Sequence, residues 1–138
     1  MANFVYEFFK NETIEHPVLD KLNEILQILS EDYLNSIAFN YGIESDKYTR
    51  NQIMDILNIK IVSEFKDRVT GFTPDEHKSF YEFYNGIIDY SNEMVYINLK
   101  KFSNLGLIYL FTDNGGKYYN FRIPEEICVI YEELLRIM

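Results

Sequence analysis

The hydrophobic pattern of the chain changes period after Gly106, and this change limits the folds that are open to it. Up to Leu105, apolar residues recur three or four positions apart, which is the spacing of a buried helix face. Two runs rich in β-branched and aromatic residues follow, at 107–112 and 117–123, joined by Asp113-Asn114-Gly115-Gly116. Such a connection is typical of a β-hairpin. The sequence therefore predicts a mainly α fold with one β-hairpin, of the α+β class.

Residues that begin and end helices divide most of the chain into helical segments. Serine or threonine N-caps, capping-box residues and N1 prolines favour helix starts, and glycine favours the position just after a helix. By these signals and the apolar spacing, the expected helices begin at Pro17, Ser30, Thr49, Thr73, about Glu93 and Pro124, with stops at Gly42, Gly86 and Gly106.

The expected internal boundary lies at Gly71-Phe72, immediately before the strong helix start at Thr73. It separates an N-terminal helical module, residues 1–70, from a C-terminal module, residues 71–138, on which the first module packs. A chain of 138 residues also suits one compact domain. Both arrangements are open at this point.

Two stretches of the chain resemble known modules. The helix at 93–105, the hairpin and the following Ile123-Pro124 resemble the last helix and wing of winged-helix domains, over about residues 73–138. This resemblance implies that the helix and the hairpin contact nucleic acid. About residues 30–58 resemble the two-helix SAP and Rho-N-like modules, through Leu34, Gly42-Ile43 and the apolar residues Ile53, Ile56 and Leu57.

One basic segment stands out in an acidic chain. The formal net charge is −9, which disfavours a typical nucleic-acid binder because phosphate neutralisation supplies much of the affinity. Residues 95–123 nevertheless carry a net positive charge. Either this is random clustering on a solvated surface, or it is a contact surface. In the second case, the expected nucleic-acid-binding residues are Lys100, Lys101, Asn104, Lys117 and Arg122.

The hairpin predicts a second candidate surface. If Asn114 and Gly115 form a two-residue turn, Phe111 pairs with Tyr118 and Leu110 with Tyr119. One face of the hairpin then suits the core. The other is aromatic, so either the N-terminal helices or a partner must cover it. The expected protein-interface residues are Tyr109, Phe111 and Tyr118.

Two functions follow as hypotheses. The first is a nucleic-acid-associated regulator that uses the winged-helix-like half. The second is a protein-binding adaptor or inhibitor, encoded by a phage or mobile element, whose acidity suits a basic partner or mimics nucleic acid. The last helix, which ends in Leu134-Leu135-Arg136-Ile137-Met138, either closes the core or pairs between the subunits of a homodimer.

An enzyme or a metal-binding protein is a third possibility. The single cysteine, Cys128, allows neither an internal disulfide nor a multi-cysteine zinc site. His16 and His77 have no ligand or catalytic partner near them in the sequence. We therefore expect no enzyme activity, no cofactor and no metal. The sequence also lacks a long apolar run and a signal-peptide pattern, so we expect a cytoplasmic protein without membrane contact.

Overall fold

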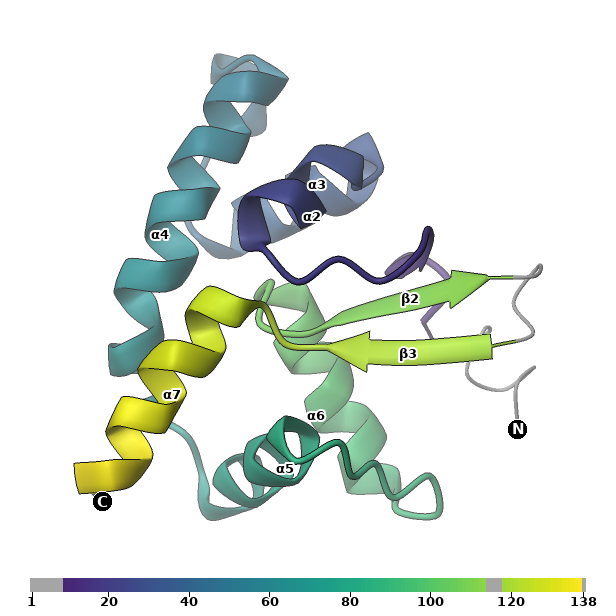
Figure 1. The fold of residues 1–138 in the computed structure, drawn as a ribbon. Helices are drawn as coiled ribbons and strands as arrows, with labels where there is room; N and C mark the ends of the chain where they lie inside the picture. Colours follow the sequence, from purple (N-terminus) through teal and green to yellow (C-terminus); the bar gives the residue numbers. More distant parts are fainter. Residues whose placement is uncertain (1–8, 114–117, 138) are drawn as a thin grey trace.

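The computed structural model describes residues 9–113 and 118–137 and is mainly helical, with one small sheet (Figure 1). The fold is of the α+β class. In chain order the elements are β1 (Thr13–Glu15), α2 (Leu22–Ile28), α3 (Glu31–Asn40), a 3₁₀ turn η1 (Ser45–Lys47), α4 (Arg50–Thr70), α5 (Pro74–Tyr84), α6 (Glu93–Asn104), β2 (Tyr109–Asp113), β3 (Tyr118–Arg122) and α7 (Glu125–Ile137).

Local capping signals located several helix ends correctly. Thr49 and Thr73 each form a complete capping box, and the Ser30 side chain caps α3 by accepting a hydrogen bond from the Tyr33 amide. Gly42 and Gly106, which follow α3 and α6, have the positive φ angles expected of glycines at helix ends. These features depend on a few neighbouring residues, which is why the sequence alone predicts them.

The expected helix start at Pro17 is wrong, because α2 begins at Leu22. The segment before it is extended and holds the short strand β1, which the sequence did not predict. Contacts from α7 fix the beginning of α2 instead. The Glu126 carboxylate accepts hydrogen bonds from the Leu22 amide at 3.1 and 3.2 Å, and the Glu125 amide donates to the Asp20 carbonyl at 2.7 Å.

The sheet has the strand order β1-β2-β3, with β2 in the centre. β1 is parallel to β2, and β3 is antiparallel to it. The expected hairpin is present, but its expected register is wrong: Phe111 pairs with Asn120 rather than with Tyr118. The shift along β3 is two residues. Because side chains alternate with period two, it leaves the composition of each face unchanged.

Tyr109 and Phe111 are not available as interface residues, contrary to the expectation from the sequence. Both side chains are buried, with exposed fractions of 0% and 1%. The N-terminal helices cover Tyr109: its ring lies 6.2 Å from that of Tyr33 on α3. Of the two coverings considered for this face, the structure therefore favours the N-terminal helices. The side chain of Tyr118 lies outside the described residues.

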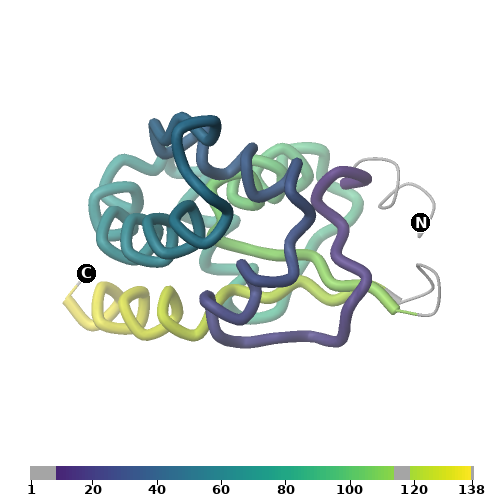
Figure 2. Tube along the Cα trace, turned by 90° about the horizontal axis from the view of Figure 1, so that it is seen from above, coloured from purple at the N-terminus to yellow at the C-terminus, as the bar shows by residue number. Residues whose placement is uncertain are grey.

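The hydrophobic core extends through both halves of the chain. Figures 1 and 2 show α4 and α7 side by side, although α5, α6, β2 and β3 lie between them in the sequence. Ile127 and Tyr131 are the buried residues of α7, and Tyr131 contacts Phe65 of α4. The last helix therefore closes the core. The sequence-based boundary at Gly71 lies at the end of α4, and residues on both sides of it belong to the same core cluster.

The structure contains the helices and strands on which the winged-helix and SAP-like resemblances depend, in the expected order along the chain. In the C-terminal half, α6 leads into the β2–β3 hairpin, but residues 87–92 before α6 form no helix. In the N-terminal half, α3 and α4 form a helix pair that is joined through η1. Many helical proteins share such an order of elements, so it does not assign the chain to either family.

The Thr73 cap generates the first prediction. Thr73→Ala removes the hydroxyl that accepts from the Glu76 amide, so it should lower the free energy of unfolding by about 1 kcal/mol. Thr73→Ser keeps that acceptor, so its free energy of unfolding should stay close to that of the parent protein. Urea denaturation measures both. Equal stability of the alanine variant and the parent would contradict the energetic role of this cap.

Two glycines with nearly the same φ give a matched second prediction. A Cβ at Gly106 would lie 2.8 Å from the Tyr109 hydroxyl and 2.9 Å from Ile61, whereas a Cβ at Gly86 would meet nothing within 4 Å. Gly86→Ala should cost about 1–2 kcal/mol, from its left-handed backbone alone. Gly106→Ala should cost about 1–3 kcal/mol more, because it also overpacks the core. Denaturant titrations measure the free energy of unfolding of both variants. Equal losses of stability in Gly86→Ala and Gly106→Ala would contradict the close packing around Gly106.

Candidate functional site

An open groove lies where α3, α4 and α6 meet. Its volume is about 460 Å³, and it brings together cationic, carboxamide and apolar side chains. The residues that line it are Asn40, Arg68, Ile97, Lys100, Lys101, Asn104 and Leu105. No carboxylate is among these described residues, although the whole chain has a formal charge of −9. We call this feature the α6 groove.

The sequence of α6 explains how it presents one face to the groove. Val95, Leu99 and Phe102 are buried in the core. Ile97 and Lys101 lie on the opposite side, four residues apart and therefore on one helix face, and both are exposed. The Asn92 side chain caps the start of α6 by accepting a hydrogen bond from the Met94 amide. Core packing on one side thus places polar and apolar groups together on the other.

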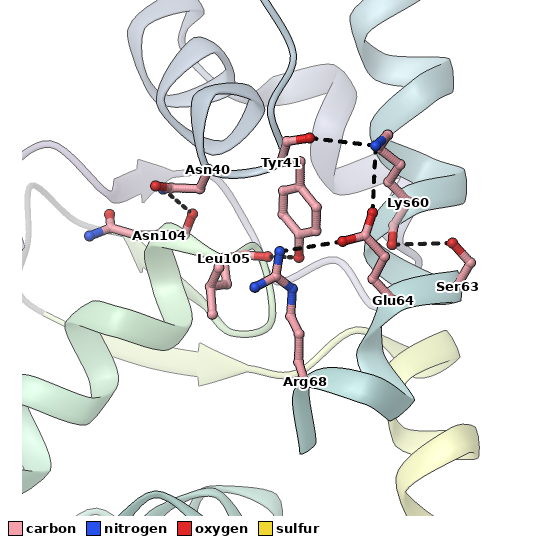
Figure 3. Close-up of polar contacts among 8 residues, drawn as sticks. All are labelled: Asn40, Tyr41, Lys60, Ser63, Glu64, Arg68, Asn104 and Leu105. Atoms are coloured by element: carbon pink, nitrogen blue, oxygen red, sulfur yellow. Dashed lines mark hydrogen bonds and ion pairs between the residues drawn. The ribbon is translucent and has the colours of Figure 1, made fainter. Parts of the chain in front are cut away.

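Side chains of α3 form the wall next to the end of α6, as Figure 3 shows. The Asn40 Nδ2 donates to the Asn104 carbonyl at 2.9 Å, and the Tyr41 hydroxyl donates to the Leu105 carbonyl at 2.6 Å. Burial raises the pKa of Tyr41 from 10.0 to about 12, so this hydroxyl remains a hydrogen-bond donor even at alkaline pH. These contacts fix the position of α3 against α6.

Arg68 of α4 joins the same network (Figure 3). Its guanidinium carbon lies 4.5 Å from the centre of the Tyr41 ring, within the range of a cation–π contact. Its Nη2 lies 3.5 Å from a Glu64 oxygen, and Lys60 Nζ lies 3.6 Å from the other oxygen of the same carboxylate. Arg68 is therefore held in place beside the groove while part of its side chain remains exposed.

The two groove lysines are paired with buried carboxylates. Lys100 Nζ lies 2.7 Å from Glu12 Oε1, and Lys101 forms an ion pair with Glu76. Only 5% of Glu12 and 5% of Glu76 is exposed. Since an unpaired buried carboxylate is costly, these pairs are part of the fold as well as of the groove. They also neutralise part of the positive charge.

The structure thus brings together three of the expected nucleic-acid-binding residues: Lys100, Lys101 and Asn104. Arg122 is not among them. It lies at a different cavity, of about 500 Å³, and its Nε is 3.5 Å from Asp20 Oδ1. Lys117 lies outside the described residues. Asn40 and Arg68 are groove residues that the sequence did not indicate, because they belong to elements far from α6 in the chain.

Other chemistry is sparse in the part of the chain that the structure describes. There, no three His, Cys, Asp or Glu side chains come close enough together to hold a metal ion. Burial raises the pKa of Cys128 to about 11, so it is a thiol rather than a thiolate at neutral pH. Among the same residues, no helix has the length and apolar character needed to cross a membrane.

Comparisons with known proteins give no assignment. No family model, curated protein or solved structure matches the chain.

Glu76 gives a pH-dependent prediction. Burial alone would raise its pKa, but hydrogen bonds from Lys101 and Thr73 and the lysine charge outweigh burial and lower it from 4.5. A lowered pKa in the folded state stabilises the fold above the unfolded pKa, and this stabilisation is lost as the pH falls through the folded value. Glu76→Gln should therefore lose less stability on acidification than the parent protein.

Urea titrations between about pH 3 and pH 7 test this expectation. Glutamine at this position still suits a capping box, so the variant changes the titration and keeps the helix start. Parallel pH profiles for the parent and Glu76→Gln would contradict a contribution from this carboxylate.

Proposed function

We propose that the protein is a nucleic-acid-associated regulator, acting by binding rather than by catalysis, and that the α6 groove contacts the phosphate backbone. The observation that carries this proposal is the lining of the groove. Three cations and two carboxamides meet there without a carboxylate among the lining residues, in a chain whose average charge is strongly negative. Cationic and amide groups are those that proteins use to contact phosphate oxygens.

The ion pairs within the groove are compatible with phosphate binding. An ammonium group has three donors, and Lys101 pairs with one carboxylate while 54% of its side chain is exposed. The carboxylate of Glu76 is buried behind it. A phosphate approaching from solvent therefore meets the ammonium group before it meets the acid.

The position of the groove in the fold also supports this proposal. The groove lies on the exposed face of α6, the helix that directly precedes the β2–β3 hairpin. The winged-helix resemblance leads us to expect nucleic-acid contacts at this helix and hairpin. We include a cytoplasmic location in the proposal, because a chain with a single cysteine makes no internal disulfide and suits a reducing compartment.

Ile97 provides a test that leaves the structural lysines in place. Its side chain is 50% exposed within the groove, so Ile97→Glu adds a negative charge there and should weaken binding to nucleic acid. Ile97→Lys adds a cation and should strengthen it. Val129 on α7 is exposed to a similar extent, 52%, so Val129→Glu and Val129→Lys are matched controls that should change binding little.

The measurement is a fluorescence anisotropy titration of labelled duplex and single-stranded oligonucleotides from ~50 to ~200 mM salt. Three phosphate contacts imply a slope of about −2.7 in log K against log salt for duplex DNA, and Ile97→Lys should steepen it by about 0.9. Absence of binding to either form at tens of micromolar protein would overturn the proposal. Equal effects of the Ile97 and Val129 substitutions would exclude the α6 groove as the contact surface.

A further inference from the structure

A second recess adjoins the α6 groove and shares two residues with it. Its volume is about 480 Å³, and it lies between the N-terminal segment, α3 and the end of α6. Every residue that lines it has a polar side chain: Asn11, Glu12, Ser30, Asp32, Tyr33, Ser36, Lys100 and Asn104. Because Lys100 and Asn104 line both features, the cationic groove and this polar recess are neighbouring parts of one surface.

The two parts differ in the chemistry that they offer. The α6 groove has three cationic residues and no carboxylate in its lining, whereas the recess has Asp32 and Glu12 together with hydroxyl and amide groups. Phosphates are attracted to the first part, whereas in the second the carboxylate of Asp32 disfavours them and Glu12 is paired with Lys100. Base edges carry both donors and acceptors, and carboxylates accept from base amino groups. A bound nucleotide would therefore place its phosphate in the groove and its base toward the recess.

Phe39 is on α3, three residues after Ser36 of the recess, and is unusually exposed. Its exposed fraction is 80%, the largest among the large apolar side chains of the described residues. Phe39 follows Ser36 by three positions and Asp32 by seven, so the geometry of α3 places all three on one side of the helix. Leu34 and Ile37 face the core instead. An exposed aromatic ring thus lies on the same face of α3 as Asp32 and Ser36, which line the recess.

We infer that the nucleic acid bound by this surface is single-stranded DNA or RNA, with an unpaired base stacked on Phe39 and base edges facing the recess. This inference rests on the proposed function. In a duplex, the bases are stacked on one another, so no base face is free to stack on the exposed ring. Exposed aromatic rings beside cationic grooves are the means by which proteins bind unpaired bases.

The experiment compares one mixed sequence as single-stranded DNA, single-stranded RNA and duplex DNA, by anisotropy at ~50 mM salt. The single strands should bind more tightly than the duplex. Phe39→Ala should weaken single-strand binding by about fivefold or more, which is the usual contribution of one stacked base, and should leave duplex binding unchanged. Phe39→Trp should retain tight binding, whereas Phe39→Leu, which is apolar but cannot stack, should not.

Tyr81→Ala is the matched control. Tyr81 is an aromatic residue on α5, 51% exposed, and it lines neither the groove nor the recess. Its replacement should leave binding unchanged. Because Phe39 is exposed, its substitution should also leave stability nearly unchanged, which thermal denaturation checks.

The outcomes separate this inference from the proposed function. Duplex binding equal to or tighter than single-strand binding would overturn the inference and leave the regulator proposal standing. A single-strand preference that survives Phe39→Ala, or is lost equally in Tyr81→Ala, would also overturn it. Absence of binding to all three ligands would overturn the proposed function and the inference together. Tighter binding of single-stranded RNA than of single-stranded DNA would support the inference and indicate that the protein also recognises the 2′-hydroxyl.

Discussion

The arrangement of the whole molecule depends on how the end of α6 is satisfied. The last carbonyl groups of a helix have no partner within the helix. Here, side chains of α3 and of Tyr41, the residue after it, donate to three successive carbonyls: Tyr33 to Ser103 at 3.0 Å, Asn40 to Asn104 at 2.9 Å and Tyr41 to Leu105 at 2.6 Å. These bonds join the two halves of the chain across more than sixty residues of sequence. They also place α3 where it forms one wall of the α6 groove.

This junction in turn lets β2 be buried on both faces. After Gly106 the chain enters a run in which Leu107 to Phe111 are all at most 1% exposed. A strand buried in this way needs cover above and below the sheet. The Tyr109 ring packs against α3, which the carbonyl bonds hold in position. Tyr109 and Phe111 of the aromatic hairpin face, which by sequence either the N-terminal helices or a partner must cover, are therefore internal.

Local signals predicted the helices and part of the site, and non-local contacts account for the rest. Thr49 and Thr73 begin helices through neighbours three residues away, so their capping boxes are readable from sequence. Lys101 and Asn104 share one face of one helix for the same reason. By contrast, β1 is three residues long and exists through parallel pairing with β2, nearly a hundred residues away. No local pattern indicates such a strand.

The same distinction explains the electrostatics of the candidate site. A count of charges along the sequence suggested a basic segment at 95–123, but the charge that matters depends on pairing in three dimensions. Arg122 lies by Asp20, Lys100 by Glu12, and Lys101 by Glu76. Arg68, which sits in a segment of balanced charge, lines the groove instead. The positive character of the groove is a property of the fold rather than of one stretch of sequence.

An acidic protein can contain an anion-binding groove because electrostatic interactions in salt solution are short-ranged. The Debye length is about 8 Å at physiological ionic strength, so exposed acids further from the groove are largely screened. At contact distance, a phosphate is governed by Arg68, Lys100 and Lys101 and by the carboxylates behind them. The negative net charge gives no long-range steering toward nucleic acid. Under the proposed function, affinity at this groove must therefore come from contacts made after encounter, to which we propose that carboxamide and aromatic side chains contribute.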